Sequence, residues 1–389
     1  MPSTRRRPSL APAKRTPKAK RTSKKAIRYA VIGLGHIAQA AVLPAFKHAS
    51  RNSVLAALVS DDSKKLEALG RKYKAAHLCH YDALDQLLAS GEIDAVYIAL
   101  PNTLHEEFTV RAAKAGIHVL CEKPIAVTTA ECERMLKSVK ENKVRLMIAY
   151  RLHFDRANLE AQKLARSGKL GDLRFFTSEF AMQAKPDNIR LKKDLGGGPL
   201  YDIGIYCINA ARNTFAADPI EVWAAATNSG DKRFREVPES VTACLKFPGD
   251  RIATFTCSFG AFTRSTYSIT GTKGSLTLDP AYTYKGTLAY EARIGEKKIR
   301  QRFGKSDQFA AELLYFSDCV LKGREPEPSG DEGLIDVRII EGLNRSIDTG
   351  RWVKLKAQQR KRRPSMKQEI RRPPVPREPT LVKVEPPHS

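Results

Sequence analysis

The sequence contains no closely paired cysteines and no long apolar run. Its seven cysteines are scattered, at positions 79, 121, 132, 207, 244, 257 and 319. This spacing argues against a zinc knuckle and is typical of reduced cysteines rather than of a disulfide framework. No uninterrupted apolar stretch approaches the ~18 residues of a membrane span, so we expect no membrane segment. We also expect no metal site.

Acidic residues are scarce at both ends of the chain. Residues 1–25 carry ten Lys or Arg and no acid, and residues 356–389 carry ten Lys or Arg and three Glu. These two ends hold +17 of the formal net charge of +25, so the middle has an ordinary balance of charge. Both ends are rich in proline and poor in large apolar side chains. We therefore predict disordered basic tails at 1–26 and 354–389.

Aromatic residues are absent from the charged runs of both tails, whereas a platform for single-stranded nucleic acid needs bases to stack on such rings. A solubilising role is therefore favoured over the alternative, non-specific binding to nucleic acid. Arg5-Arg6-Arg7 is not followed by an apolar segment, which disfavours a secretory signal. We expect a cytoplasmic protein.

Between the tails, the hydrophobic pattern changes once. Apolar runs alternate with helical patterns up to residue 150, which predicts βαβ units and a parallel sheet, so we place a Rossmann dinucleotide-binding domain at 27–150. From residue 151 onward, alternating segments are separated by turn residues such as those at 248–250 and 271–274. This pattern predicts an α+β domain with a mostly antiparallel open sheet at 151–353. The fold class is α/β.

A glycine motif follows the first apolar run. The residues Gly33-Leu34-Gly35-His36-Ile37-Ala38 stand between a predicted strand and a predicted helix. In that setting Gly33 permits a tight turn, Gly35 lets the backbone approach a pyrophosphate, and Ala38 keeps the helix close to the sheet. The start of the helix attracts the phosphates. The motif predicts a dinucleotide site.

The end of the second predicted strand bears on which dinucleotide binds. Enzymes that use NAD usually place an acid there to hold the ribose 2′-hydroxyl. Here the strand ends in Ser60, with Lys64 and Lys65 close behind, which suits a 2′-phosphate. Asp61 and Asp62 oppose that interpretation if either points inward. We favour NADP over NAD.

Two further motifs carry groups for proton chemistry. Lys123, in Cys121-Glu122-Lys123-Pro124, follows a predicted strand, at the edge of a parallel sheet where ligands bind. Asp202 and Tyr206 stand four residues apart on a predicted helix and so share one face. A nearby ammonium group can lower the pKa of a tyrosine. A pair of Lys123 and Tyr206 could therefore pass a proton to or from a substrate hydroxyl.

Together these motifs resemble the Gfo/Idh/MocA superfamily of oxidoreductases, over about 27–353. Tyr150-Arg151 matches another characteristic element of that family. Many members have His where this chain has Tyr206, and the Tyr resembles the branch of glucose–fructose oxidoreductase and dimeric dihydrodiol (xylose) dehydrogenase. The resemblance implies that Lys123 and Tyr206 handle the proton and that Asp202 positions a sugar. It also implies a homo-oligomer, a dimer or tetramer, built through the face of the antiparallel sheet.

The resemblance further implies a set of cofactor contacts. They are Gly33, Gly35, His36 and Ile37 at the pyrophosphate, Ser60 and Lys65 at the 2′-phosphate, Pro101, Asn102 and His105 along the groove, and Glu122 and Arg151 beside the nicotinamide. Further cofactor contacts are expected at Leu34, Tyr81, Leu100 and Lys123.

Three functions stay open at this point. The first is an NADP-dependent oxidoreductase that moves hydride between nicotinamide and an aldose or polyol, as in glucose–fructose oxidoreductase. The second is a trans-dihydrodiol or D-xylose dehydrogenase with the same residues. The third, of another class, is a non-catalytic NADP-sensing regulator, which would not need Lys123, Asp202 and Tyr206 together.

Overall fold

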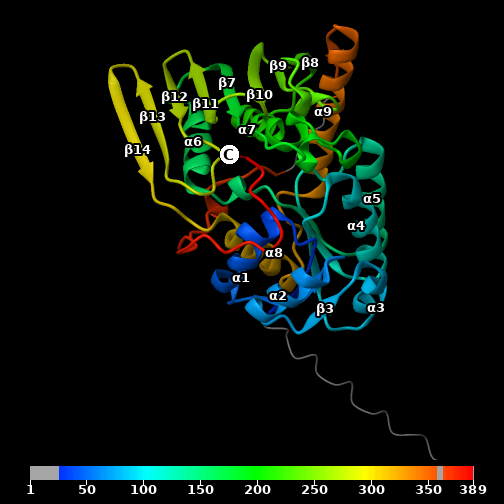
Figure 1. Ribbon diagram of the computed structural model, residues 1–389. Coiled ribbons are helices and arrows are strands. Elements are labelled where there is room, and N and C mark those ends of the chain that lie inside the picture. The colour runs from blue at the N-terminus through cyan, green and yellow to red at the C-terminus, as the bar shows by residue number, and fades with distance from the viewer. Residues whose placement is uncertain (1–25, 357–361, 389) are drawn as a thin grey trace, which may run out of the picture.

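The computed structural model describes residues 26–356 and 362–388. Its first sheet has six parallel strands in the order β3-β2-β1-β4-β5-β6 (Figure 1). The strands are β1 Ile27–Ile32, β2 Ser53–Val59, β3 His77–Cys79, β4 Ala95–Ile98, β5 His118–Cys121 and β6 Leu146–Ile148. The order reverses between β1 and β4, and in such sheets the ligand crevice opens at that reversal.

Helices between these strands cover both faces of the sheet, as the alternating pattern predicts. They are α1 Leu43–Ala49, α2 Ser63–Tyr73, α3 Leu84–Ala89, α4 His105–Lys114 and α5 Thr129–Glu141. Their starts follow from local chemistry: the Thr128 side chain and Glu131 form a reciprocal capping box on α5. A late helix, α8 (Gln308–Leu321), returns to pack against α1 and the sheet. Chain order alone does not indicate this return.

The second sheet has nine strands in the order β14-β13-β12-β11-β7-β10-β9-β8-β15. They are β7 Leu173–Ala181, β8 Glu221–Thr227, β9 Ser240–Phe247, β10 Arg251–Ser258, β11 Arg264–Gly271, β12 Gly274–Leu278, β13 Leu288–Ile294, β14 Lys297–Phe303 and β15 Val353–Lys354. All pairs are antiparallel except β7 with β10. The prediction of a mostly antiparallel sheet is confirmed.

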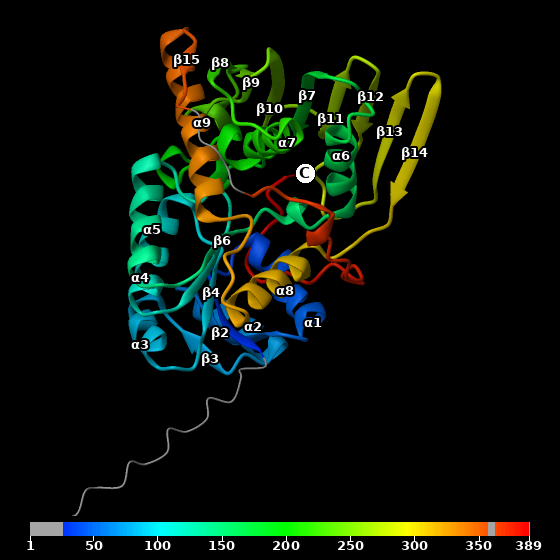
Figure 2. The same cartoon turned by 180° about the vertical axis from the view of Figure 1, so that it is seen from behind.

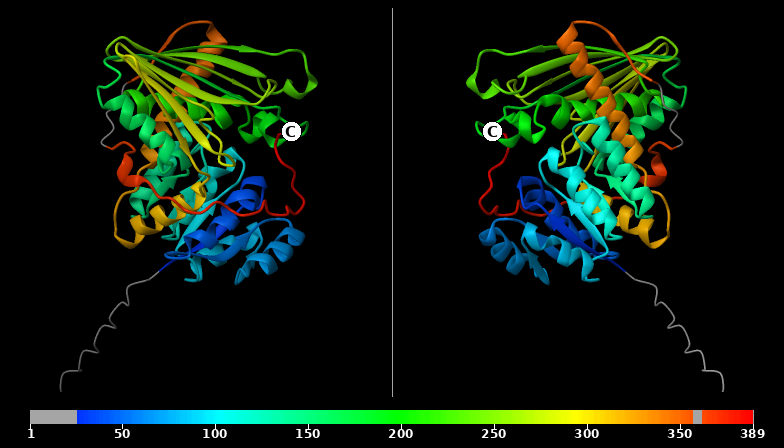
Figure 3. Two further views of the ribbon diagram at one scale, coloured as in Figure 1. Left: turned by 90° about the vertical axis from the view of Figure 1, so that its left-hand side faces the viewer. Right: turned by 90° about the vertical axis from the view of Figure 1, so that its right-hand side faces the viewer.

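Three helices pack on one face of this sheet: α6 Arg156–Arg166, α7 Ile205–Phe215 and α9 Gly330–Thr349. Figure 3 shows the sheet above α6 and α7, with its other face turned outward, while α9 rises alongside the end of the sheet that holds β8 (Figure 1). Alternation along β9 explains the arrangement, because Val241, Ala243, Leu245 and Phe247 are buried while the residues between them are more exposed. No helix of residues 26–356 or 362–388 is long and apolar enough to cross a membrane.

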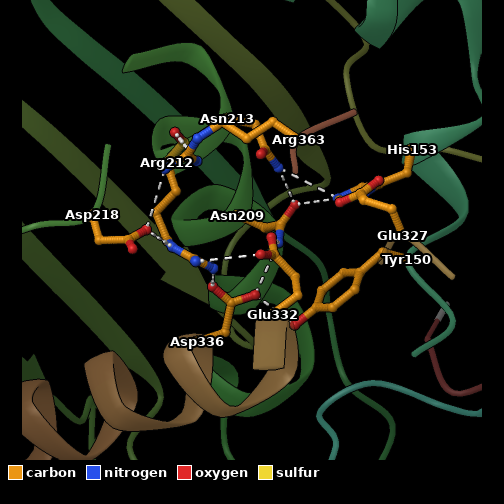
Figure 4. Close-up of polar contacts among 10 residues, drawn as sticks. All are labelled: Tyr150, His153, Asn209, Arg212, Asn213, Asp218, Glu327, Glu332, Asp336 and Arg363. Atoms are coloured by element: carbon orange, nitrogen blue, oxygen red, sulfur yellow. Dashed lines mark hydrogen bonds and ion pairs between the residues drawn. The ribbon is translucent and has the colours of Figure 1, made fainter. Parts of the chain in front are cut away.

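A buried network of charges joins the helices behind the sheet (Figure 4). The fully buried guanidinium of Arg212 on α7 bonds Asp218, 2.8 Å away, and also Glu332 and Asp336 of α9. Asn209, one turn before Arg212, donates to the same two α9 carboxylates at 2.8 and 2.9 Å. Each buried charge thus has a partner, as burial requires. The network fixes α7 against α9.

The prediction of disorder for 354–389 is wrong for residues 362–388, the C-terminal segment. Arg363 bonds the Arg212 carbonyl at 3.0 Å, and Gln368 donates two bonds of 2.8 Å to Glu327. The segment then crosses to the Rossmann domain and ends between the two domains (Figures 1 and 2). Composition misses this order because polar contacts, not a large apolar surface, hold the segment. Residues 1–25 of the other predicted tail lie outside the described residues.

Candidate active site

A cavity of about 800 Å³ lies between the two domains, at the carboxyl ends of the Rossmann strands. Its volume falls within the ordinary range for small-molecule sites. Both domains and the C-terminal segment contribute walls. Seven Lys or Arg side chains line it, against five acidic ones: Lys65, Lys123, Arg151, Lys185, Arg190, Lys285 and Lys383, against Asp61, Glu122, Asp187, Asp202 and Glu385. The excess of positive charge suits an anionic ligand.

The glycine motif forms one end of the cavity. Gly33 follows β1 with a φ of 90°, and a Cβ there would lie 2.5 Å from the carbonyl oxygen of Ala99, so only glycine fits. A Cβ on Gly35 would meet no protein atom within 4 Å, because that position faces the open cavity. Leu34, His36 and Ile37 line the cavity too. The two glycines therefore differ in their surroundings: Gly33 is packed against the chain, and Gly35 faces the cavity.

Beyond β2, the acidic residues divide between two surroundings. Asp62 caps α2, accepting bonds from the Lys64 and Lys65 amides at 3.0 and 3.1 Å, and it does not line the cavity. Asp61 does line the cavity, with Ser60 and Lys65. Ser60 is buried, and its hydroxyl accepts a 3.2 Å bond from the Asp62 amide. Asp62 thus caps the helix, whereas Asp61 lines the cavity together with Lys65.

The two later motifs meet at the other end of the cavity. The Lys123 ammonium donates to Asp202 Oδ1 at 3.0 Å and to the Asp202 carbonyl at 2.8 Å. The Lys123 Nζ also lies 5.0 Å from the centre of the Tyr206 ring. Arg190 donates to Asp202 Oδ2 at 2.6 Å, so the carboxylate lies between two cations. Lys123 therefore forms an ion pair with Asp202, and its ammonium lies over the aromatic ring of Tyr206.

These contacts determine the charge states at that end. Burial alone would raise the pKa of Asp202, but Arg190 and Lys123 outweigh it and hold the pKa well below the usual range. Burial would lower the pKa of Lys123, yet the charges of Asp202, Tyr206 and Glu122 prevail and raise it. The ammonium–carboxylate pair is therefore ionised at neutral pH.

Two buried carboxyl groups lie deeper, near Arg151. Burial raises the pKa of Glu122, which accepts a 2.9 Å bond from the Tyr97 hydroxyl. Burial, followed by repulsion from Glu122, raises the pKa of Glu312 on α8. Arg151 is oriented by bonds of 2.5 Å to the Gln308 side chain and the Tyr282 carbonyl. Glu122 and Arg151 form this floor of the cavity, while Glu312 lies outside its lining.

Comparison with known proteins identifies the architecture. Residues 27–150 match the model described as oxidoreductase family, NAD-binding Rossmann fold, and residues 158–277 match the GFO/IDH/MocA C-terminal domain. The D-xylose 1-dehydrogenase [NADP(+)] of Haloarcula marismortui is 31% identical over 85% of this chain and 93% of its own. The chain belongs to the GFO/IDH/MocA family of oxidoreductases.

Two solved structures share the fold of this chain. An aldose-aldose oxidoreductase from Caulobacter crescentus, complexed with glycerol, is 39% identical, with a TM-score of 0.81 over 85% of this chain and 100% of that one. A 3-ketoreductase from Actinomadura kijaniata, in complex with NADP and TDP-benzene, is 27% identical, with a TM-score of 0.76 over 82% of this chain and 98% of that one.

Most of the residues singled out from the sequence gather around this one cavity. Gly33, Leu34, Gly35, His36, Ile37, Ser60, Lys65, Tyr81, Leu100, Pro101, Asn102, Glu122, Lys123, Arg151, Asp202 and Tyr206 all line it.

The placement of His105 in the groove is wrong. The imidazole is fully buried and absent from the lining, with its two nitrogens 2.8 and 3.0 Å from the carbonyl oxygens of Pro124 and Leu100. It ties the loop after β4 to the turn that carries Lys123. Its position at the first residue of α4 turns its side chain inward, and spacing within the motif does not show this.

Three contributors to the site were not predicted from the sequence. Arg190 belongs to a stretch with no regular pattern, and it is identified only by its bond to Asp202. Lys285 lies in a loop before β13, among residues with no distinctive spacing. The end of the C-terminal segment, residues 383–388, was assigned to a disordered tail. None of these carries a local motif.

Proposed function

We propose that this protein is an NADP-dependent sugar oxidoreductase, acting on a CH–OH group of an aldose or polyol. The observation that carries the proposal is the meeting of Lys123, Asp202 and Tyr206 at one end of a cavity whose other end is the glycine turn. The xylose dehydrogenase and aldose-aldose oxidoreductase relatives support the substrate class.

The cavity fits a dinucleotide. The open position at Gly35 leaves room for a pyrophosphate against the backbone, and the lining carries an excess of cations. Leu34, His36 and Ile37 would contact the pyrophosphate, Ser60 and Lys65 the 2′-phosphate, and Tyr81, Leu100, Pro101 and Asn102 the length of the groove. Glu122 and Arg151 would flank the nicotinamide, whose chemistry when bound is to accept or give a hydride.

The chain's own residues then divide the proton work. Lys123, kept protonated by Asp202, donates to the substrate oxygen and stabilises the negative charge that develops there. Tyr206 takes the hydroxyl proton in oxidation and returns it in reduction. Arg190 holds Asp202, and Asp202 in turn holds the Lys123 ammonium in place. The remaining lone pairs of the Asp202 carboxylate accept hydrogen bonds from the sugar hydroxyls and so position the sugar. The buried floor excludes water.

Absorbance of the purified protein tests the function. With aldose added and no nucleotide supplied, a nicotinamide band that appears, and then disappears with a second carbonyl substrate, supports retained NADP and the aldose-aldose type of cycle. Turnover only with added NADP supports a dissociable D-xylose or dihydrodiol dehydrogenase. No nicotinamide signal in either case, across a panel of sugars and diols, contradicts the enzyme and favours the NADP-sensing regulator.

We also propose a homo-oligomer, a dimer or tetramer, formed through the outward face of the second sheet. Phe175 of β7 and Ile252 of β10 are partners across adjacent strands and are 47% and 41% exposed. Such neighbouring apolar side chains favour contact with another surface. The protein is expected to act in the cytoplasm. Light scattering of the wild type and of Phe175→Asp tests the assembly, and a wild-type monomer would contradict it.

A further inference from the structure

The end of the C-terminal segment forms one wall of the cavity. Residues 378–388, here called the cover, follow the Rossmann domain upward and finish beside the second domain (Figure 3). Lys383, Val384, Glu385, Pro386, Pro387 and His388 line the cavity itself. A ligand in the groove would therefore touch chain from three sources: the two domains and the cover.

Specific contacts attach the cover to the Rossmann domain. Gln39, which is 1% exposed, accepts a 2.7 Å bond from the Val382 amide. Its side-chain amide donates to the Val382 carbonyl at 3.0 Å and to Leu34, in the glycine turn, at 2.8 Å. A buried glutamine thus joins the cover directly to the turn that would hold the pyrophosphate. Such a paired exchange fixes the register of the cover.

The same segment is attached to the second domain. The Lys185 amide donates to the Pro387 carbonyl at 3.1 Å, and Ala184 pairs with His388 in an antiparallel bridge. Two salt bridges accompany these bonds, Lys185 with Glu385 at 3.4 Å and Lys285 with Glu378 at 2.9 Å. The cover therefore spans the mouth of the groove from one domain to the other.

Lys383 lies where the cover passes the end of β2. Its φ of 50° is unusual for a non-glycine residue, and such conformations persist where surrounding contacts impose them. The ammonium lies 3.0 Å from Asp62 Oδ2, while the residue lines the cavity with Ser60 and Lys65. Because this pair with Asp62 is half-exposed, it is weak, and the ammonium can turn to a stronger anion.

We infer that the cover is part of the cofactor site: it slows nucleotide exchange, and Lys383 binds the 2′-phosphate. This rests on the proposed function and deepens it.

The test is the rate of NADPH release, followed by nicotinamide fluorescence after adding excess NADP. It compares the full chain, a chain ending at Arg377, Lys383→Gln, and Lys367→Gln as matched control, because Lys367 is an exposed lysine of the same segment outside the cavity. We expect release at least tenfold faster from the shortened chain, and three- to tenfold faster for Lys383→Gln with NADPH but not NADH. Lys367→Gln should match the full chain.

Equal release rates from the full and shortened chains, both active with added NADP, would show that the cover does not slow nucleotide exchange. The proposed function would still stand. Tighter binding by the shortened chain would also overturn the role of the cover, because the segment would then compete with the nucleotide. If no variant binds NADPH or oxidises any sugar, the proposed function and the cover fail together. The Lys383→Gln result keeps the inference testable should the shortened chain fold poorly.

Discussion

Two clusters of buried charge lie within about three turns of each other along residues 200–215, and they differ in what surrounds them. At the start, Asp202 is held between Lys123 and Arg190 beside the cavity. Further on, Arg212 is enclosed by three carboxylates, and none of these four residues reaches the cavity (Figure 4). The first cluster can contact a ligand, whereas the second contributes to the stability of the fold.

The difference shows that buried ion pairs alone do not indicate a site. Each cluster pairs its buried charges with one another, and each shifts a pKa strongly: that of Asp202 is lowered and that of Arg212 is raised. What separates them is the open space beside Lys123 and the ring of Tyr206 at 5.0 Å. Removing a member should therefore affect turnover in one cluster and stability in the other.

The largest effect is expected from Lys123→Met. Loss of a charged donor at the reacting oxygen should lower kcat about 10²- to 10³-fold, with NADP affinity changed only a few-fold. Stopped-flow hydride transfer with an aldose measures it. Lys140→Met, at an exposed lysine of α5, is the matched control. Full activity of the Lys123 variant would remove the distinction between the two clusters.

The converse change is Arg212→Met. It leaves Asp218, Glu332 and Asp336 without their common cation, and breaking a buried ion pair in this way costs about 3–5 kcal/mol of unfolding free energy. Urea unfolding measures the loss. At a temperature where the variant is folded, kcat should stay near the wild-type value. A kcat loss as large as that of Lys123→Met would mean that the second cluster also serves the chemistry.

A smaller effect is expected from Asp202→Asn. Asp202 raises the pKa of Lys123, so its neutral replacement should lower that pKa and move the alkaline limit of the pH–rate profile toward lower pH. Below that limit, kcat/KM should fall about ten- to a hundredfold, because Lys123 and the sugar lose a positioning group. Asp194→Asn, at an exposed acid nearby, should leave the profile unchanged. An unshifted alkaline limit would show that Lys123 protonation does not govern it.

The same contrast explains what the sequence could predict. Glu122-Lys123-Pro124 and the spacing of Asp202 and Tyr206 are local patterns on regular elements, and the structure brings them together at one cavity. Apolar runs between helical patterns likewise predict the first sheet, and alternating segments predict the second. The short β3 and α3 have three and six residues, too few to show a period, and they were not predicted.

Residues whose role depends on distant parts of the chain escaped prediction. Arg190 belongs to the site because the fold brings it into contact with Asp202. Lys383 lies 321 residues after Asp62 in the sequence, yet the charged atoms of the two side chains are 3.0 Å apart. The C-terminal segment was judged by its prolines and charges, while its order comes from bonds to residues such as Gln39 and Glu327.

The smallest effect concerns the other end of the cavity. Lys65 lines the wall near Ser60, whereas its neighbour Lys64 is exposed and outside the lining. Lys65→Gln should lower the preference for NADP over NAD about tenfold, since a hydrogen bond to a charged group contributes ~1.5–3 kcal/mol and Lys383 would retain part of the attraction. The ratio of kcat/KM values for the two nucleotides measures it, with Lys64→Gln as control. If both variants kept the wild-type ratio, cofactor choice would lie with Ser60, Asp61 and Lys383, and the charge that distinguishes the two nucleotides would come mainly from the cover.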